Sequence, residues 1–223
     1  MKTPIELEKE FDTFFSQINF DRVSDIVGAS PNFSNADYIN KKQKIIVELK
    51  VIDKDFFEKG GIIHRLNTII TVPKNIDTKG YGQYEFTLPN QNREGKHDTF
   101  EEPLRRILKK ANKQIRETNR VILNDNGIGF VMIALNMQIA IDPEKIRELT
   151  GELVSREFSS ISGFVICTLS YGFNSSETGL IHPVCLPTTE YGCPEWIHKA
   201  CVDIGTKWCE FGNKVLTLST FDY

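Results

Sequence analysis

The sequence predicts an α/β protein, because segments with helical spacing of apolar residues alternate along the chain with short apolar runs typical of strands. The chain has 223 residues, of which 40% are hydrophobic and 26% charged. This composition is that of a globular protein with a core of its own. We find no repeat, low-complexity tract or linker, so we expect a single domain over residues 1–223.

Composition also excludes several classes of protein. The longest apolar runs, near Ile45–Val47 and Phe130–Leu135, are too short to cross a bilayer, so we expect no membrane partner. The first residues carry no apolar signal segment, and the five cysteines are an odd number, which favours reduced thiols in the cytoplasm. The net charge is −3, so a nucleic-acid partner would have to meet a local basic surface.

The first half of the chain predicts a helix followed by a hairpin. Thr3 as N-cap, Pro4 at the first helical position and Glu6 predict a helix over residues 3–19. Its apolar stripe is Leu7, Phe11, Phe14, Phe15 and Ile18. Two strands follow at 33–39 and 44–52, joined by a polar turn at 40–43. Residues 54–96 are the least regular part, with an apolar segment at 62–72 and a short strand at 83–88.

The second half alternates helices and strands more regularly. A capping box at Thr99–Glu102 predicts a helix to Arg120, whose buried stripe is Leu104, Ile107, Leu108, Ala111 and Ile115. A buried strand at 128–136, a helix at 142–158 and a strand at 163–170 come next. A helix at 194–210 and a closing strand at 214–219 complete the prediction.

The informative stretch is the hairpin, where side-chain parity can be followed. Because side chains alternate between the faces of a strand, Glu48 and Lys50 share one face. If the hairpin turns about Lys41-Lys42, facing residue numbers sum to 83, and Asp37 lies opposite Ile46 on that same face. Asp37 and Glu48 are then diagonal neighbours.

Two carboxylates and a lysine on a half-buried face need a reason, because unpaired charges there carry a heavy desolvation cost. A divalent ion held by Asp37 and Glu48 is one reason, and hard oxygen ligands suit Mg²⁺ or Mn²⁺. Such an ion activates a bound water and neutralises charge on a phosphate. Lys50 could then orient that water or stabilise the pentacoordinate phosphorus. The plainer alternative is a solvated strand face carrying a Glu–Lys pair.

On these residues the sequence resembles the PD-(D/E)XK nuclease superfamily, which includes many restriction endonucleases, resolvases and repair exonucleases. The matching run is the helix at 3–19, Asp37, Glu48-Leu49-Lys50, the helix at 99–120 and the strand at 128–136. The residue before Asp37 is Ala36, where the family signature has Pro. The resemblance implies a restriction-endonuclease-like core over residues 1–136, with a central mixed sheet flanked by helices. Residues 137–223 would form a C-terminal α/β extension.

The resemblance also implies roles for particular residues. Asp37 and Glu48 would bind the metal with the backbone carbonyl of Leu49, and Lys50 would assist catalysis. Gln114, on the flank of the helix at 99–120, would point at the metal site or the scissile strand, with Lys110 behind it. Glu10 is a candidate third carboxylate from the first helix, the alternative being a surface acid.

The helix at 99–120 supplies the candidate nucleic-acid surface, through Lys109, Lys110, Lys113 and Arg116. A basic band of this kind can follow a phosphate backbone, although it can equally be a solvated helix face. We therefore expect a metal-dependent nuclease acting on nucleic acid, DNA more than RNA, as a homodimer or in a larger complex. The alternative is a non-catalytic module of the same fold that binds nucleic acid or a protein partner.

The remaining candidates carry less weight. Cys185, Cys193, His198, Cys201 and Cys209, with His182, suggest a zinc-stabilised interaction protein, but no Cys-x₂-Cys pair is present. Cys201 falls on one helical stripe with Ile197, Ile204 and Trp208, so we expect it to be a core residue. His64 lies in an apolar stretch without a visible partner and receives no role.

Overall fold

The computed structural model describes residues 4–28, 31–53, 98–136, 143–169, 172–173, 180–181, 185–189 and 192–211. The predicted apolar segment at 62–72 and the strands at 83–88 and 214–219 lie outside these residues. So do Thr3, His64 and His182.

The described strands form a six-stranded mixed sheet in the order β1-β2-β3-β4-β5-β8. The three central strands β3, β4 and β5 are parallel, and the pairs at both edges are antiparallel. The strand bounds are β1 Asp21–Arg22, β2 Tyr38–Asn40, β3 Ile45–Asp53, β4 Ile128–Asn136, β5 Gly163–Thr168 and β8 Cys185–Thr189. A separate two-stranded ribbon pairs β6 Gly172–Phe173 with β7 Leu180–Ile181. The predicted α/β class and mixed sheet are confirmed.

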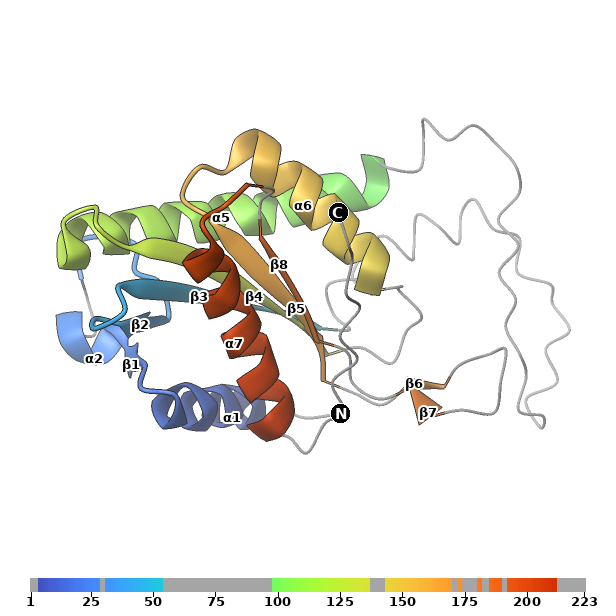
Figure 1. Ribbon diagram of the computed structural model, residues 1–223, viewed down its shortest axis with the longest axis horizontal. Helices are drawn as coiled ribbons and strands as arrows, with labels where there is room; N and C mark the ends of the chain where they lie inside the picture. The colour runs from blue at the N-terminus through green and yellow to red at the C-terminus, as the bar shows by residue number, and fades with distance from the viewer. Residues whose placement is uncertain are drawn as a thin grey trace, which may run out of the picture.

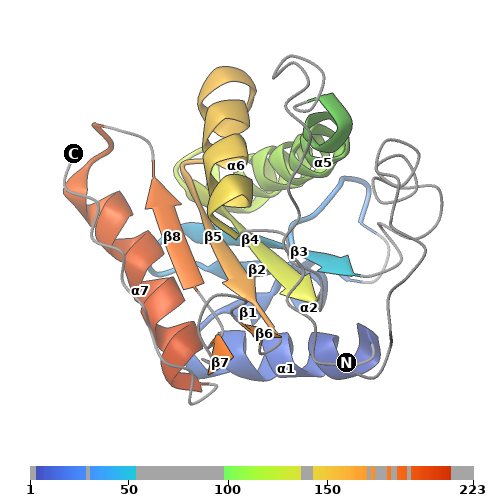
Figure 2. The same cartoon turned by 90° about the vertical axis from the view of Figure 1, so that its right-hand side faces the viewer.

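Helices cover both faces of this sheet (Figures 1 and 2). The helix bounds are α1 Pro4–Gln17, α2 Val23–Val27, α5 Asp98–Leu123, α6 Pro143–Glu157 and α7 Glu195–Phe211. The buried side chains of α5 and α6 pack on one face of the sheet, and those of α1 and α7 pack on the other. Within the second layer, Phe11 of α1 stacks on Trp208 of α7 with ring centroids 4.5 Å apart. None of the helices in the described ranges is long and apolar enough to cross a bilayer.

Strand β4 lies at the centre of the sheet and is buried on both faces, which explains its uninterrupted apolar sequence. Gly129 lets α5 approach this strand closely. A Cβ there would lie 2.2 Å from the Cγ2 atom of Ile115 and 2.4 Å from the carbonyl oxygen of Ser160. The predicted apolar stripes of the helices at 3–19 and 99–120 face the sheet as expected.

The predicted strand at 33–39 is wrong over most of its length, because β2 includes only Tyr38–Asn40. The segment before it is held by side chains of α5 and not by a strand. The backbone N–H of Ser34 donates to Glu117 at 2.7 Å, and that of Ala36 donates to Thr118 Oγ1 at 2.8 Å. An extended segment held in this way can have the sequence pattern of a strand although it makes no backbone hydrogen bonds to a neighbouring strand.

Three further differences concern boundaries and missed elements. The short β1 and α2 were not predicted. Thr99 is not an N-cap, because α5 already includes Asp98, and this helix continues to Leu123. The predicted C-terminal extension contributes to the central sheet itself, because β5 and β8 belong to the same sheet as β3 and β4, and α6 and α7 pack on its two faces.

Candidate active site

The hairpin of β2 and β3 brings Asp37 and Glu48 to the same edge of the sheet. The pairs Tyr38 with Val47 and Ile39 with Ile46 give facing numbers that sum to 85 and not to 83. The expected diagonal placement is therefore wrong, because the register differs by two residues from the expected one. Continued by one pair beyond β2, the observed register sets Asp37 opposite Glu48. Parity is unchanged by a shift of two, so the two residues still share a face.

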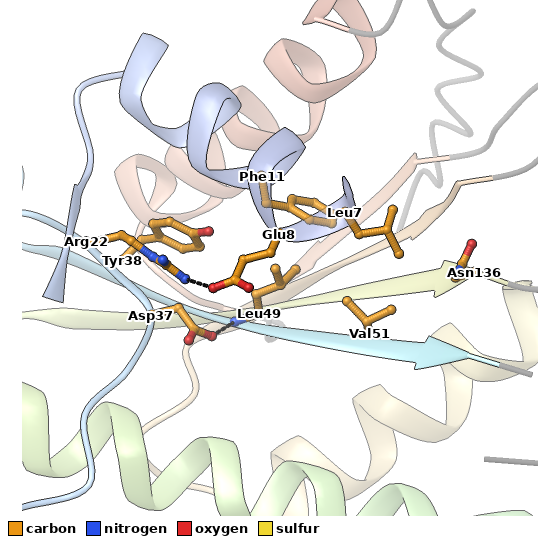
Figure 3. Close-up of a pocket in the computed structure, with 9 residues that line it drawn as sticks. All are labelled: Leu7, Glu8, Phe11, Arg22, Asp37, Tyr38, Leu49, Val51 and Asn136. Atoms are coloured by element: carbon orange, nitrogen blue, oxygen red, sulfur yellow. Dashed lines mark hydrogen bonds and ion pairs between the residues drawn. The ribbon is translucent and has the colours of Figure 1, made fainter. Parts of the chain in front are cut away.

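Asp37 lies immediately before β2, where the edge of β3 has no strand beside it. Its Oδ2 accepts a hydrogen bond from the backbone N–H of Leu49 at 2.9 Å (Figure 3). The side chain thus takes the place that a strand carbonyl would occupy. Because the N–H and C=O of one strand residue point to the same side, the carbonyl of Leu49 also faces this open edge.

Glu48, Lys50 and Gln114 meet on the face of the sheet covered by α5. The side chain of Glu48 is only 1% exposed and accepts a hydrogen bond from Lys50 Nζ through Oε1. Lys50 Nζ also donates to Gln114 Oε1 at 3.1 Å, and Gln114 Nε2 donates to the carbonyl oxygen of Asn35 at 2.8 Å. The structure therefore brings Asp37, Glu48, Lys50 and Gln114 into one cluster.

One oxygen of this cluster is unsatisfied. Glu48 Oε2 is buried and has no partner within ordinary hydrogen-bonding geometry among the described residues, although weaker contacts between Glu48 and the backbone and carboxyl of Asp37 act on the pKa values of the two acids. A buried acceptor left in this state destabilises the folded protein, typically by about 1–3 kcal/mol or more for a charged group. The orphan oxygen is the feature of the site that calls for a ligand.

The raised pKa values of the two acids also favour a bound cation. Burial, and then the negative charge of Asp37, raise the pKa of Glu48 to about 8, although Lys50 opposes this shift. Burial also raises the pKa of Asp37, against the opposing effects of the Leu49 N–H and of Lys50. Both carboxyls are thus harder to ionise together than in water, and a cation between them would favour the doubly ionised state.

The donor set fits a hard divalent ion. It consists of the carboxylates of Asp37 and Glu48, including the orphan Oε2, and the nearby carbonyl of Leu49. Within the described ranges no three or more His, Cys, Asp or Glu residues gather so as to hold a metal. Two carboxylates and one carbonyl are fewer ligands than a Mg²⁺ ion takes, so waters would have to complete its coordination.

The acidic residue of α1 that lies near Asp37 is Glu8, whereas the sequence suggested Glu10. Glu8 lines a cavity beside Asp37, together with Arg22 of β1. Glu10 is half-buried and is not among the residues that line this cavity, so its role as a ligand stays a prediction. Sequence reasoning missed Glu8 and Arg22. Glu8 could have been found from the sequence, because it lies three residues before the buried Phe11 and so on a neighbouring part of the helix surface. Arg22 could not, because a two-residue strand has no recognisable sequence pattern.

The basic face of α5 is exposed and lies over a groove of about 660 Å³ beside the end of α6. Lys109, Lys110, Lys113 and Arg116 all line it. Lys113 is 3.8 Å from Glu117, and no acidic partner is present among the described residues for the other three. Arg105 and Arg106 contribute less charge than the sequence suggests, because they pair with Glu101, Glu102 and Glu157.

The cysteines of the C-terminal half serve the core where the structure describes their contacts. Cys201 is fully buried as predicted, its thiol donates to the carbonyl oxygen of Phe164 at 3.4 Å, and burial raises its pKa to about 12. His198 hydrogen-bonds through Nδ1 to Thr189 Oγ1 at 2.9 Å. Neither residue belongs to a metal-binding set of the described chain.

Comparison of the chain with protein-family models, with curated proteins and with solved structures finds no match. The resemblance to the PD-(D/E)XK nucleases consequently rests on Asp37, on Glu48-Leu49-Lys50 and on the order of the elements around them.

Proposed function

We propose that this protein is a metal-dependent nuclease that hydrolyses phosphodiester bonds of nucleic acid, DNA in preference to RNA. The observation that carries the proposal is the cluster of Asp37, Glu48 and Lys50 around a buried carboxylate oxygen that has no hydrogen-bond partner in the part of the chain that the structure describes. The order of elements adds support, since α1, the hairpin, α5 and β4 follow one another as in the PD-(D/E)XK core.

A purely structural role explains the cluster poorly. On the same face of β3, Ile46 and Ile52 are buried core residues. Replacing a buried ion pair by apolar residues is often neutral or stabilising, by about 1–4 kcal/mol. An apolar residue at position 48 would therefore serve the core better, and a buried glutamate there is better explained by a ligand.

Asp37, Glu48 and the carbonyl of Leu49 are the groups that would hold Mg²⁺ or Mn²⁺. When bound, such an ion supplies an activated water and neutralises charge that develops on the phosphate. The side chain of Lys50 is 17% exposed, so its ammonium can reach a substrate at the sheet edge and stabilise negative charge on the phosphoryl oxygens. Gln114 is a positioning residue, because it holds Lys50 Nζ and is itself anchored to the segment before β2.

Helix α5 connects this cluster to the basic groove. Gln114 lies on the flank of α5 that faces the sheet, and Lys110 lies one turn before it on the same flank. From there Lys113, Lys109 and Arg116 continue round the exposed side. The groove opens toward the end of α6, where Glu157 and Phe158 line it. A bound strand would therefore have to cross the exposed side of α5, past Lys113 and Lys110, to bring a phosphate to Lys50.

A non-catalytic module is the second candidate. The observation in its favour is that Lys50 already pairs with Glu48, which leaves only part of the cluster unsatisfied without a metal. Such a module would bind nucleic acid through α5 and show no dependence on a divalent ion.

A cleavage assay separates the two candidates. The purified chain is incubated with plasmid, linear duplex, single-stranded DNA and RNA, in Mg²⁺, Mn²⁺ or EDTA, beside Asp37→Asn and Lys50→Met. Lys42→Met, at an exposed position of the hairpin turn, is the matched control. We expect metal-dependent cutting that both site variants lose and the control keeps. Binding of nucleic acid without cutting, and without any metal-dependent thermal shift, would support the module instead.

A further inference from the structure

A cavity of about 230 Å³ lies on the face of the sheet opposite Lys50 and Gln114. It opens to solvent and is bordered by α1 and by residues of β1, β2, β3 and β4, with Asp37 at one end of it. Figure 3 shows Leu7, Glu8 and Phe11 reaching from α1 toward Leu49 and Val51 of β3. Asp37 is thus shared between this cavity and the candidate metal site.

The lining combines apolar walls with a polar rim. Leu7, Phe11, Leu49 and Val51 supply the walls, and Val51 remains 39% exposed at the mouth. At the rim, Arg22 donates through Nη2 to Glu8 Oε1, and its Nε lies 3.0 Å from Asp12 Oδ1. Glu8 is itself 56% exposed. A molecule that enters from solvent would therefore meet the second carboxylate oxygen of Glu8 and the N–H groups of Arg22 that these pairs leave unused.

Charge argues against a phosphate in this cavity. Among the described residues that line the cavity, Arg22 is the cation, and it already pairs with Glu8 and with Asp12 beside the cavity. Lys50 acts on Asp37 from the other face of the sheet, so the cavity side of Asp37 is acidic. An anion would be repelled, whereas a neutral ring with donors on its edge would find acceptors. Size agrees with a ring, because a cavity of roughly 150 Å³ already accommodates benzene.

We propose that this cavity binds one nucleobase of the substrate strand, at the nucleotide next to the scissile phosphate. The proposal rests on the proposed function, because Asp37 is what places the cavity beside the cut. The base edge would hydrogen-bond to Glu8 and Arg22, and its ring would pack on Leu49 and Val51. A base can enter only when it is unpaired, so the preferred substrates are single strands, frayed ends or sites where a nucleotide is easily extruded.

The test fills the cavity from its exposed rim and removes the base from the substrate. Val51→Trp places a large ring at the mouth, and Val121→Trp, at a similarly exposed valine of α5 that does not line the cavity, is the matched control. A series of single-stranded oligonucleotides carries one abasic position each, moved stepwise past the cleavage site. Cleavage gives kcat/KM, and equilibrium binding to the Lys50→Met protein gives the affinity.

We expect one abasic position, adjacent to the cut, to lower kcat/KM of the unmodified protein by about tenfold to hundredfold, the range for loss of one base contact. Val51→Trp should cleave intact and abasic strands equally slowly, whereas Val121→Trp should behave like the unmodified protein. An abasic series without any sensitive position, in a protein that binds and cuts, would overturn this proposal alone. Absence of both nucleic-acid binding and metal-dependent cutting would instead overturn the proposed function.

Discussion

Replacing Glu48 by glutamine should stabilise the metal-free protein at alkaline pH and leave it nearly unchanged at acid pH. The glutamine keeps the shape and one oxygen of the side chain but removes the charge that burial and Asp37 disfavour. Lys50 keeps Gln114 Oε1 as an acceptor in this variant. The substitution therefore isolates the ionisation of one buried carboxyl.

The sign and size follow from the pKa of Glu48, which is about 8 in the folded protein against a usual value of 4.5. The folded state binds this proton more tightly than the unfolded chain, so its contribution to stability is complete below pH 4.5 and is lost as pH rises through about 8. With one pKa unit equal to about 1.36 kcal/mol, the loss between pH 5 and pH 9 comes to about 4 kcal/mol. Asp37 shifts in the same direction, and Lys50 opposes both shifts.

Urea unfolding in EDTA at pH 5 and at pH 9 measures this difference. The free energy of unfolding of Glu48→Gln, minus that of the unmodified protein, should grow by about 4 kcal/mol between the two pH values. Taking the difference at each pH cancels groups that titrate alike in both proteins. A difference that stays constant within about 1 kcal/mol would contradict a raised pKa, since it would mean that Glu48 ionises in the folded state as it does in water.

Other predictions concern the parts around the cluster. Gln114→Ala should lower the free energy of unfolding by about 1–3 kcal/mol and reduce kcat more than it raises KM. Gln114→Glu keeps an acceptor for Lys50 but loses the donor to the Asn35 carbonyl, so it should retain more kcat than Gln114→Ala without recovering the lost stability. Equal kcat for the two variants would contradict a positioning role. Arg116→Ala should reduce the slope of log affinity against log salt by about 1, and Arg156→Ala, whose guanidinium already pairs with acids, should leave it unchanged; equal slopes would argue against α5 as the phosphate-binding face. Phe14→Ala should lower the free energy of unfolding in urea by about 3–5 kcal/mol, because Phe14 is fully buried between α1 and α7; a loss below about 1 kcal/mol would contradict that packing.

The elements that the sequence predicts well are those in which apolar residues recur with a clear helical or strand spacing, or form an unbroken run. The stripe of α1, the continuous apolar run of β4 and the stripe of α7 with Cys201 each follow from burial on one or both faces. The shared face of Asp37 and Glu48 was predictable for the same reason, because strand parity survives an error of two in the register.

The register itself was not predictable from residue types. Asn40 belongs to β2, and its side chain accepts a hydrogen bond from the backbone N–H of Gln43 at 2.9 Å. The loop then closes at Lys44 with a positive φ of 58°. This conformation is uncommon for residues other than glycine, so a lysine gives no reason to expect it. The false strand at 33–37 has a similar cause, since its backbone donors bond to Glu117 and Thr118 of α5, about eighty residues away.

The position of a bound Mn²⁺ ion would show whether Asp37 and Glu48 form a metal site. Crystals of the protein soaked in Mn²⁺, and of Asp37→Asn treated in the same way, would be measured at the manganese absorption edge. We expect an anomalous peak between the carboxylates of Asp37 and Glu48, next to the carbonyl of Leu49, and no such peak in Asp37→Asn. Fully ordered carboxylates without a peak, or a peak only at other residues, would contradict the claim that this cluster is a metal-dependent active site.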